Sequence, residues 1–149
     1  MDIYWEALPL ISGFIIEYFL YTKYKFRAGG VVVIPLLAVY TIKFPALIPT
    51  LLFISFVTFV ALELLYHRLV IYGRRLMYLA LTIGIIFTVI LTPLFDSNLG
   101  WYTLIIPGLI AYNVHRENNS PAHLAKSLLI NTATYLLLIV IGIISLYIF

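Results

Sequence analysis

The sequence predicts an all-α integral membrane protein: a bundle of four long transmembrane helices plus two short broken or half-helix segments. Of its 149 residues, 64% are hydrophobic and 10% are charged, whereas a soluble domain carries roughly 25% charged residues. Four apolar runs are each long enough to cross about 30 Å of hydrocarbon, which takes roughly 20 helical residues. The basic residues cluster at the ends of these runs, as the positive-inside rule expects of a membrane protein.

The four long apolar runs cover residues 3–22, 46–66, 75–95 and 123–149. No basic residue precedes Lys23, so the first run lacks the basic start of a secretory signal peptide. We therefore expect the first run to remain in the mature protein. The expected location is the plasma membrane, with several crossings.

Two shorter apolar runs, residues 29–42 and 100–114, lie between the long ones. At 1.5 Å per residue, each would reach only about 21–23 Å as a regular helix. Each has glycine and proline: Gly29, Gly30 and Pro35 in the first run, and Gly100, Pro107 and Gly108 in the second.

Proline is favoured in the first turn of a helix, so half-helices are expected to start near Pro35 and Pro107. Residues 29–34 and 100–106 would then be largely extended, since an extended residue covers about 3.3 Å and makes up the missing reach. Unpaired backbone is tolerated at membrane depth only where protein or water shields it. The two broken segments therefore belong at the centre of the bundle.

The two short runs resemble each other. Residues 33–40 (VIPLLAVY) match residues 105–112 (IIPGLIAY), 72 residues further along the chain. Each half, about 1–74 and 75–149, reads as a long helix, a broken segment and a long helix, which predicts an internal repeat within one membrane domain. If the short runs cross the membrane, the halves have opposite orientations, as in the inverted repeats of transporters.

Charge placement bears on whether the short runs cross the membrane or are re-entrant. If they cross, and the amino terminus lies outside, eight of the nine basic residues face the cytoplasm and only Lys43 lies outside. The eight are Lys23, Lys25, Arg27, Arg68, Arg74, Arg75, Arg116 and Lys126. Re-entrant runs would instead place Arg68, Arg74 and Arg75 outside. The positive-inside rule favours six crossings with both termini outside, and the sequence leaves the re-entrant alternative open.

The two half-helix amino termini form the first candidate site. Unpaired N–H groups and the helix dipole there favour anions weakly. A substrate path along them would involve Gly29, Gly30, Pro35, Gly100, Pro107 and Gly108. The alternative interpretation, which we favour slightly, is that these glycines allow helix backbones to pack closely.

The basic residues of the cytoplasmic face form the second candidate site. They are Lys23, Lys25, Arg27, Arg68, Arg74, Arg75 and Arg116. Such a face would attract a polyanion or the acidic surface of a partner. Orientation signalling and contact with anionic lipid explain most clusters of this kind, and without further evidence they are the favoured interpretation here.

Two acidic residues fall inside long apolar runs, where an ionised side chain needs a partner or a cavity. Glu63 is expected to pair with His67, one helical turn further along. Glu17 is expected to reach Tyr21 or to extend toward Lys23.

The sequence does not predict an enzyme active site or a cofactor. Cysteine is absent, so disulfide, thiolate and cysteine–metal chemistry do not arise. The histidines lack metal-ligand spacing and are expected at the membrane interface, and no metal or nucleic-acid ligand is predicted. Asn131, Thr132 and Thr134 are expected to make hydrogen bonds between helices.

Three stretches of the chain resemble the PgsC/CapC family, the small membrane subunit of poly-γ-glutamate synthesis in capsule-forming bacteria. The stretches are residues 71–75 (IYGRR), 105–111 (IIPGLIA) and, less closely, 28–32 (AGGVV). Leu36 stands where the family pattern has a glycine, and residues 117–120 have no recognisable counterpart.

The resemblance implies a non-catalytic membrane subunit of a synthase and export complex. It would dock a cytosolic ATP-dependent ligase, work with an outward-facing membrane-anchored subunit and pass the anionic polymer across the membrane, as a homo- or hetero-oligomer. A pure scaffold for the ligase and an unrelated small-solute transporter are the alternatives. Under the export hypothesis, Gly108→Leu should block polymer release while leaving ligase recruitment intact.

Overall fold

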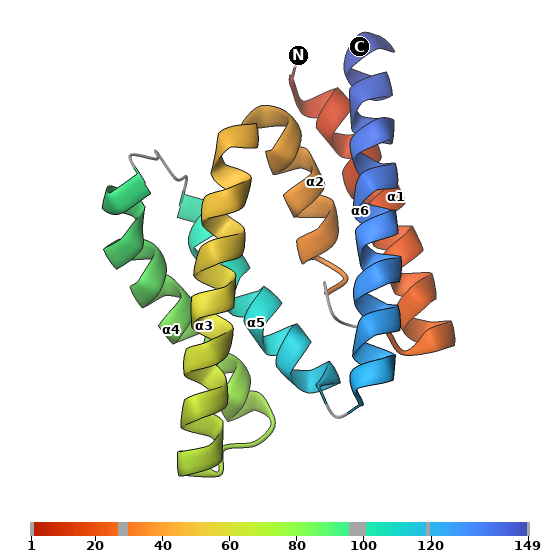
Figure 1. Ribbon diagram of the computed structural model, residues 1–149. Helices are drawn as coiled ribbons and strands as arrows, with labels where there is room; N and C mark the ends of the chain where they lie inside the picture. Colours follow the sequence, from red (N-terminus) through yellow and green to blue (C-terminus); the bar gives the residue numbers. More distant parts are fainter. Residues whose placement is uncertain (1, 27–29, 96–100, 119, 149) are drawn as a thin grey trace. The chain divides into compact units, whose positions relative to one another are not determined.

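The computed structural model describes residues 2–26, 30–95, 101–118 and 120–148, and these form helices with no strand among them (Figure 1). The α-helices are α1 (Asp2–Tyr24), α2 (Val33–Lys43), α3 (Ile48–Leu69), α4 (Arg74–Leu91), α5 (Ile106–Glu117) and α6 (Pro121–Ile148). The short 3-10 helices are η1 (Pro45–Leu47), η2 (Thr92–Phe95) and η3 (Trp101–Leu104). The predicted all-helical class is confirmed.

Within the described residues, three helical segments are long and apolar enough to cross a membrane: Pro45–Leu69, Arg74–Leu91 and Pro121–Ile148. Large apolar side chains cover their outer faces, as at Phe56, which is 64% exposed. The chain is therefore an α-helical membrane protein. Helix α1 has 23 residues but carries Glu6 and Glu17, and its crossing, like that of the two short helices, stays a prediction.

The helices form two compact units. The first unit, Met1–Pro45 with Glu117–Phe149, contains α1, α2 and α6. The second unit, Ala46–Arg116, contains α3, α4 and nearly all of α5. The units do not coincide with the predicted sequence halves, because each takes two helices from one half and the last helix of the other.

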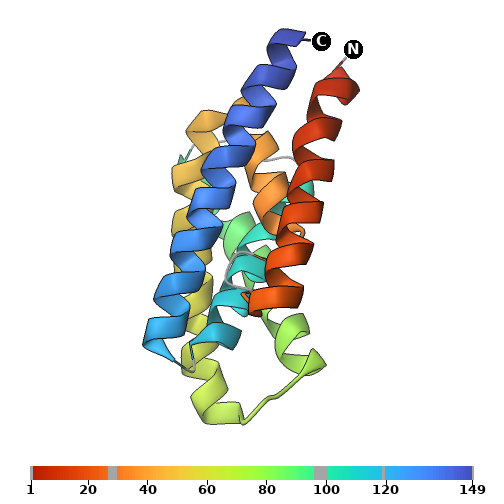
Figure 2. The ribbon, with the colours of Figure 1, turned by 90° about the vertical axis from the view of Figure 1, so that its right-hand side faces the viewer.

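In the first unit, α1 and α6 run antiparallel and α2 packs against both (Figure 2). The Ser145 hydroxyl of α6 donates a hydrogen bond to the Trp5 carbonyl of α1 at 3.0 Å. Ile34 and Ala38 of α2 pack against Leu138 of α6 in a buried cluster. These contacts bury the small and apolar sides of the three helices against one another.

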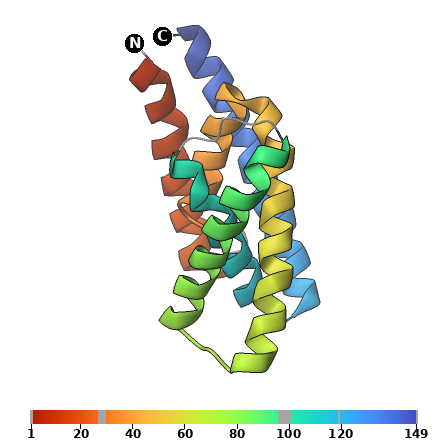
Figure 3. The same cartoon turned by 90° about the vertical axis from the view of Figure 1, so that its left-hand side faces the viewer.

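In the second unit, α3 and α4 form an antiparallel hairpin with a short turn (Figure 3). Helix α5 joins them through Tyr112, which packs on a buried cluster of Leu62, Leu76 and Ala80. Since Leu76 is near the start of α4 and Tyr112 is in the middle of α5, the start of α4 lies beside the middle of α5.

The two short helices begin close to their prolines, as predicted: α2 at Val33 and α5 at Ile106. The prediction of extended backbone before them is wrong for the described residues 31–34 and 101–104, which form a turn running into α2 and the 3-10 helix η3. In the first case, the N–H groups of Val33 and Ile34 donate to the Gly30 carbonyl. Local pairing of this kind satisfies backbone groups that have no water to bind in an apolar interior.

The first long helix of each half presents the same pattern of buried positions. The buried residues, one turn apart, are Trp5, Pro9, Gly13 and Glu17 on α1 and Leu76, Ala80, Gly84 and Thr88 on α4. Each position on α4 lies 71 residues after its counterpart on α1. In both helices the glycine of the stripe meets the proline-bearing start of the following short helix. This matching contact supports the internal repeat, whose inverted orientation stays a prediction.

Candidate anion-binding pocket

Charged residues gather at opposite ends of the first unit. At one end, Lys23 closes α1, and the Phe26 ring lies 5.2 Å from the ring of His123 near the start of α6. At the other end, the Lys43 ammonium pairs with the Glu6 carboxylate. Lys43, the basic residue expected outside, is thus neutralised by an acidic residue expected on the same side.

Basic residues of the second unit gather where α3 ends, α4 starts and α5 ends. They are Arg68, Arg74, Arg75 and Arg116, and all four are exposed. The predicted grouping of these arginines therefore holds within this unit. Their orientation toward the cytoplasm remains a prediction.

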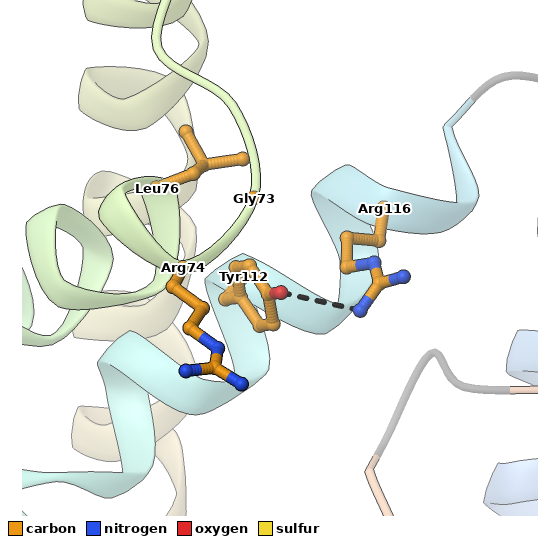
Figure 4. A pocket seen from close by; sticks show the side chains of 5 residues that line it. All are labelled: Gly73, Arg74, Leu76, Tyr112 and Arg116. Carbon is orange, nitrogen blue, oxygen red and sulfur yellow. Dashed lines mark hydrogen bonds between the residues drawn. The ribbon is translucent and has the colours of Figure 1, made fainter.

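Two of these arginines line a pocket of about 290 Å³ (Figure 4). Its lining residues are Gly73, Arg74, Leu76, Tyr112 and Arg116. In Figure 4, Tyr112 lies between the side chains of Arg74 and Arg116. The pocket therefore combines two positive side chains, a phenol and the first turn of α4.

The turn between α3 and α4 explains why the α4 amino terminus is open. Val70 ends α3 in a left-handed conformation, with φ 49°. Gly73 precedes α4 with φ 67° and ψ −133°, a conformation that glycine adopts without strain. No side chain caps α4. The first N–H groups of a helix have no partner within it, so they favour an anion at this end.

Tyr112 holds Arg116 in place. The Arg116 guanidinium donates a hydrogen bond from Nη1 to the Tyr112 hydroxyl at 3.2 Å, and its Cζ lies 5.6 Å from the ring centre. The Tyr112 ring packs in turn on the buried cluster around Leu62 and Leu76. The arginine therefore loses less side-chain entropy when it binds a ligand.

The chemistry of the pocket suits a carboxylate or phosphate. Guanidinium groups bind such anions through paired, charge-assisted hydrogen bonds. The helix terminus adds a favourable dipole of about 0.3–1 kcal/mol. A volume of about 290 Å³ is at the lower end for small-molecule sites, so one anionic group with its nearest atoms fits better than a large folded ligand.

The first candidate site, at the broken segments, is tightly packed where it is described. Pro35 lies against Gly13, and Gly108 lies against the backbone of Ala80 on α4. Gly30 has φ 78°, and its carbonyl accepts from the N–H groups of Val33 and Ile34 at the start of α2. These contacts favour the close-packing interpretation over an open anion path. Three further predicted residues, Gly29, Gly100 and Arg27, lie outside the described residues.

Polar residues of α3 and α6 differ in part from the sequence-based expectations, although the expected Glu63–His67 pair is present. The main partner of Glu63 is His115 of α5, with Oε1 and Nδ1 2.8 Å apart, while His67 lies 3.8 Å from Oε2. The hydroxyls of Thr132 and Thr134 donate to carbonyls of their own helix rather than across helices.

The remaining predicted residues lie at helix ends. Lys23 lies over the rings of Phe19 and Tyr24, each with its Nζ 5.4 Å from the ring centre. Lys25 has φ 59° and lies over Tyr21 at 5.8 Å. In the described part of the chain, no group of three or more histidine and acidic side chains is arranged to hold a metal.

Sequence reasoning missed two parts of the pocket. Gly73 belonged to the family-like stretch 71–75 but carried no role of its own. Tyr112 was noted as part of the repeat, and its spacing of four residues from Arg116 on one helix was the available signal for their contact.

The fold and the pocket define an α-helical membrane protein with a basic, anion-suited cavity at one end of a helical unit. Residues 12–123 match the family described as capsule biosynthesis CapC, so the chain belongs to this family. Family membership assigns the protein a role in capsule biosynthesis. No curated protein and no solved structure matches the chain.

Proposed function

We propose that this protein is the non-catalytic membrane subunit of a poly-γ-glutamate synthase and export complex, spanning the plasma membrane several times. It docks the cytosolic ATP-dependent ligase and helps to pass the anionic polymer outward beside a membrane-anchored partner. The proposal joins the family role in capsule biosynthesis to the chemistry of the pocket, because γ-linked polyglutamate carries one free carboxylate on each residue.

The single observation that carries the proposal is the pairing of Arg74 and Arg116 around Tyr112 at the open start of α4. Repeated carboxylates suit such a site, since each can exchange for the next along the chain. The site also lies among exposed arginines, which raise the local concentration of a polyanion.

A pure scaffold is the second candidate function. The broken segments are closed by the contacts of Gly13 with Pro35 and of Gly84 with Gly108, which favours a protein that offers no polymer path of its own. Under this alternative the basic face binds an acidic surface of the ligase instead. A polymer path between protomers or along a partner subunit is compatible with both the export and the scaffold hypotheses.

The Gly108→Leu test expected from the sequence is unsuitable, because even a Cβ at this position would lie 2.6 Å from the Ala80 carbonyl oxygen. The failure of such a variant would report misfolding. Exposed arginines offer a cleaner experiment.

The experiment compares two double variants in the complete complex in cells. Arg74→Gln with Arg116→Gln removes both pocket charges, and the control, Arg68→Gln with Arg75→Gln, removes the same charge at the same end of the unit. The readouts are secreted polymer, polymer retained in the cell, and ligase recovered with the membrane. Loss of charge-assisted contacts should weaken polymer binding about tenfold.

The proposal expects the pocket variant to lose much more secreted polymer than the control, while the ligase stays with the membrane in both. Loss of ligase from the membrane in that variant would favour the scaffold. Normal secretion with normal recruitment would contradict a role for the pocket in either function. If deleting the whole chain altered solute uptake but not polymer, the small-solute transporter would be the better account.

A further inference from the structure

Glu17 is a buried carboxyl that the proposed function does not use. Its residue is 2% exposed, and its Oε1 atom has no hydrogen-bond partner. The expected contact with Lys23 is not made, because that ammonium lies over two aromatic rings. A buried acceptor without a partner costs free energy unless a ligand or proton satisfies it.

The helix opposite Glu17 is identified by the register of α1 against α6. Trp5 faces Ser145, and Gly13 faces Leu138, where a Cβ on the glycine would lie 2.9 Å from Cδ1. One further turn in this antiparallel register sets Glu17 opposite Thr134. The buried face of α6 continues from there to Asn131 and Ser127.

Asn131 also has an unsatisfied acceptor. The residue is 3% exposed, and its amide nitrogen donates to Ser127 at 3.2 Å, but its Oδ1 atom has no partner. The neighbouring Thr134 hydroxyl donates to the Ile130 carbonyl at 3.0 Å, which leaves the lone pairs of its oxygen free to accept. Two buried acceptors and a hydroxyl oxygen therefore lie on the buried sides of α1 and α6.

The cationic side chains with printed contacts in the first unit lie against other groups. Lys43 pairs with Glu6 at the other end of α1, Lys25 lies over Tyr21, and the ring of His123 is tilted against Phe26, while Lys126 is exposed. The titratable neighbour on α6, Tyr135, bonds to Thr41 of α2 at 2.5 Å. Tyr21, one turn beyond Glu17, is a phenol and brings no positive charge.

We propose that Glu17, Asn131 and Thr134 form a binding site for one monovalent cation, either a proton or Na⁺. Carboxylate, amide and hydroxyl oxygens are ligands for hard cations. One carboxylate brings one negative charge, which a monovalent ion neutralises. The site lies one turn from Gly13, which contacts Pro35 in the first turn of α2. This site shares no residue with the arginine pocket, so its test is separate from the test of the proposed function.

The first test uses dicyclohexylcarbodiimide, an apolar reagent that adds to a protonated carboxyl and leaves a stable N-acylurea. Membranes containing the full chain are treated without Na⁺, with NaCl and with choline chloride, and the modified residue is identified by mass spectrometry. We expect Glu17 to be labelled. Protection by NaCl but not by choline chloride assigns the site to Na⁺, and labelling without protection assigns it to a proton.

The second test measures the thermal unfolding midpoint of the full chain as NaCl replaces choline chloride. A Na⁺ site raises the midpoint, and Glu17→Gln, Asn131→Leu and Thr134→Val each abolish the rise. The matched control is Thr132→Val, which removes the same hydroxyl contact from an exposed position of the same helix. If Glu17 is not labelled and Na⁺ does not change the midpoint, the proposal is overturned.

Discussion

Gly84 of α4 lies against the backbone of Gly108 of α5, so that a Cβ on Gly84 would come within 2.6 Å of the Gly108 nitrogen. In the other unit, Gly13 of α1 meets the side chain of Pro35 of α2, with the added Cβ 2.6 Å from Cγ. Each contact joins the long helix of a half to the short helix that follows it. The two contacts occupy corresponding places in the two halves, in agreement with the predicted repeat.

Gly84→Ala should destabilise the protein by about 1–3 kcal/mol, because the new methyl group meets backbone, which yields less than the end of a flexible side chain. The control Thr82→Ala changes an exposed position of the same helix and should stay within about 0.5 kcal/mol. The measurement is the free energy of unfolding in detergent. Equal values for the two variants would mean that α4 and α5 do not pack as described.

Gly13→Ala should also destabilise, but here the new methyl group meets side chains: Pro35 at 2.6 Å and Leu138 at 2.9 Å. Replacing the proline ring removes part of the clash, so Pro35→Ala should recover part of the stability lost in Gly13→Ala. A double-mutant cycle of unfolding free energies measures this recovery. If the losses of stability in Gly13→Ala and Pro35→Ala are strictly additive, the Pro35 ring does not contact Gly13.

His115→Phe keeps a ring against Tyr66, whose centre lies 4.5 Å away, but removes the 2.8 Å contact with Glu63. Since Glu63 is largely buried, losing this partner should cost about 1–3 kcal/mol of stability. His67→Phe is the control, because its side chain is 76% exposed and lies 3.8 Å from the carboxylate. A greater loss of stability in His67→Phe would show that His67, not His115, is the more important partner of Glu63.

Tyr112→Phe tests the positioning of Arg116 without removing either charge of the pocket. It deletes the hydroxyl that accepts from Arg116 and keeps the ring packed. Binding of a polyglutamate fragment to the purified protein should weaken by the value of one hydrogen bond, about 0.5–1.5 kcal/mol. The control Tyr78→Phe, at an exposed position on α4, should leave binding unchanged. If both variants lose the same affinity, the Tyr112 hydroxyl has no specific role in the pocket.

The sequence predicted features that depend on local pattern. The length of the apolar runs predicted the four long helices. Pro35 and Pro107 predicted the starts of the two short helices to within two residues. Charge at the ends of runs also indicated which basic residues gather at one end, as Arg74 and Arg116 do.

The sequence did not predict features that depend on pairing between helices. Nothing local shows that Glu63 also meets His115, and more closely than His67, because His115 lies on another helix. The backbone before α2 was expected to be extended, but Gly30 supplies a carbonyl that closes a turn. The last helix of the first half, α3, packs in the second unit, and the last helix of the second half, α6, packs in the first. The periodicity of apolar residues does not show this exchange.

The crossing of the short helices is the claim on which the inverted repeat and the cytoplasmic position of the pocket both depend. The chain has no cysteine, so single substitutions report one position each. Lys43→Cys and Ser120→Cys are compared in intact cells with a thiol reagent that does not cross membranes. Six crossings predict labelling of the Lys43→Cys variant from outside and of the Ser120→Cys variant only after permeabilisation. Labelling of both variants only after permeabilisation would contradict six crossings.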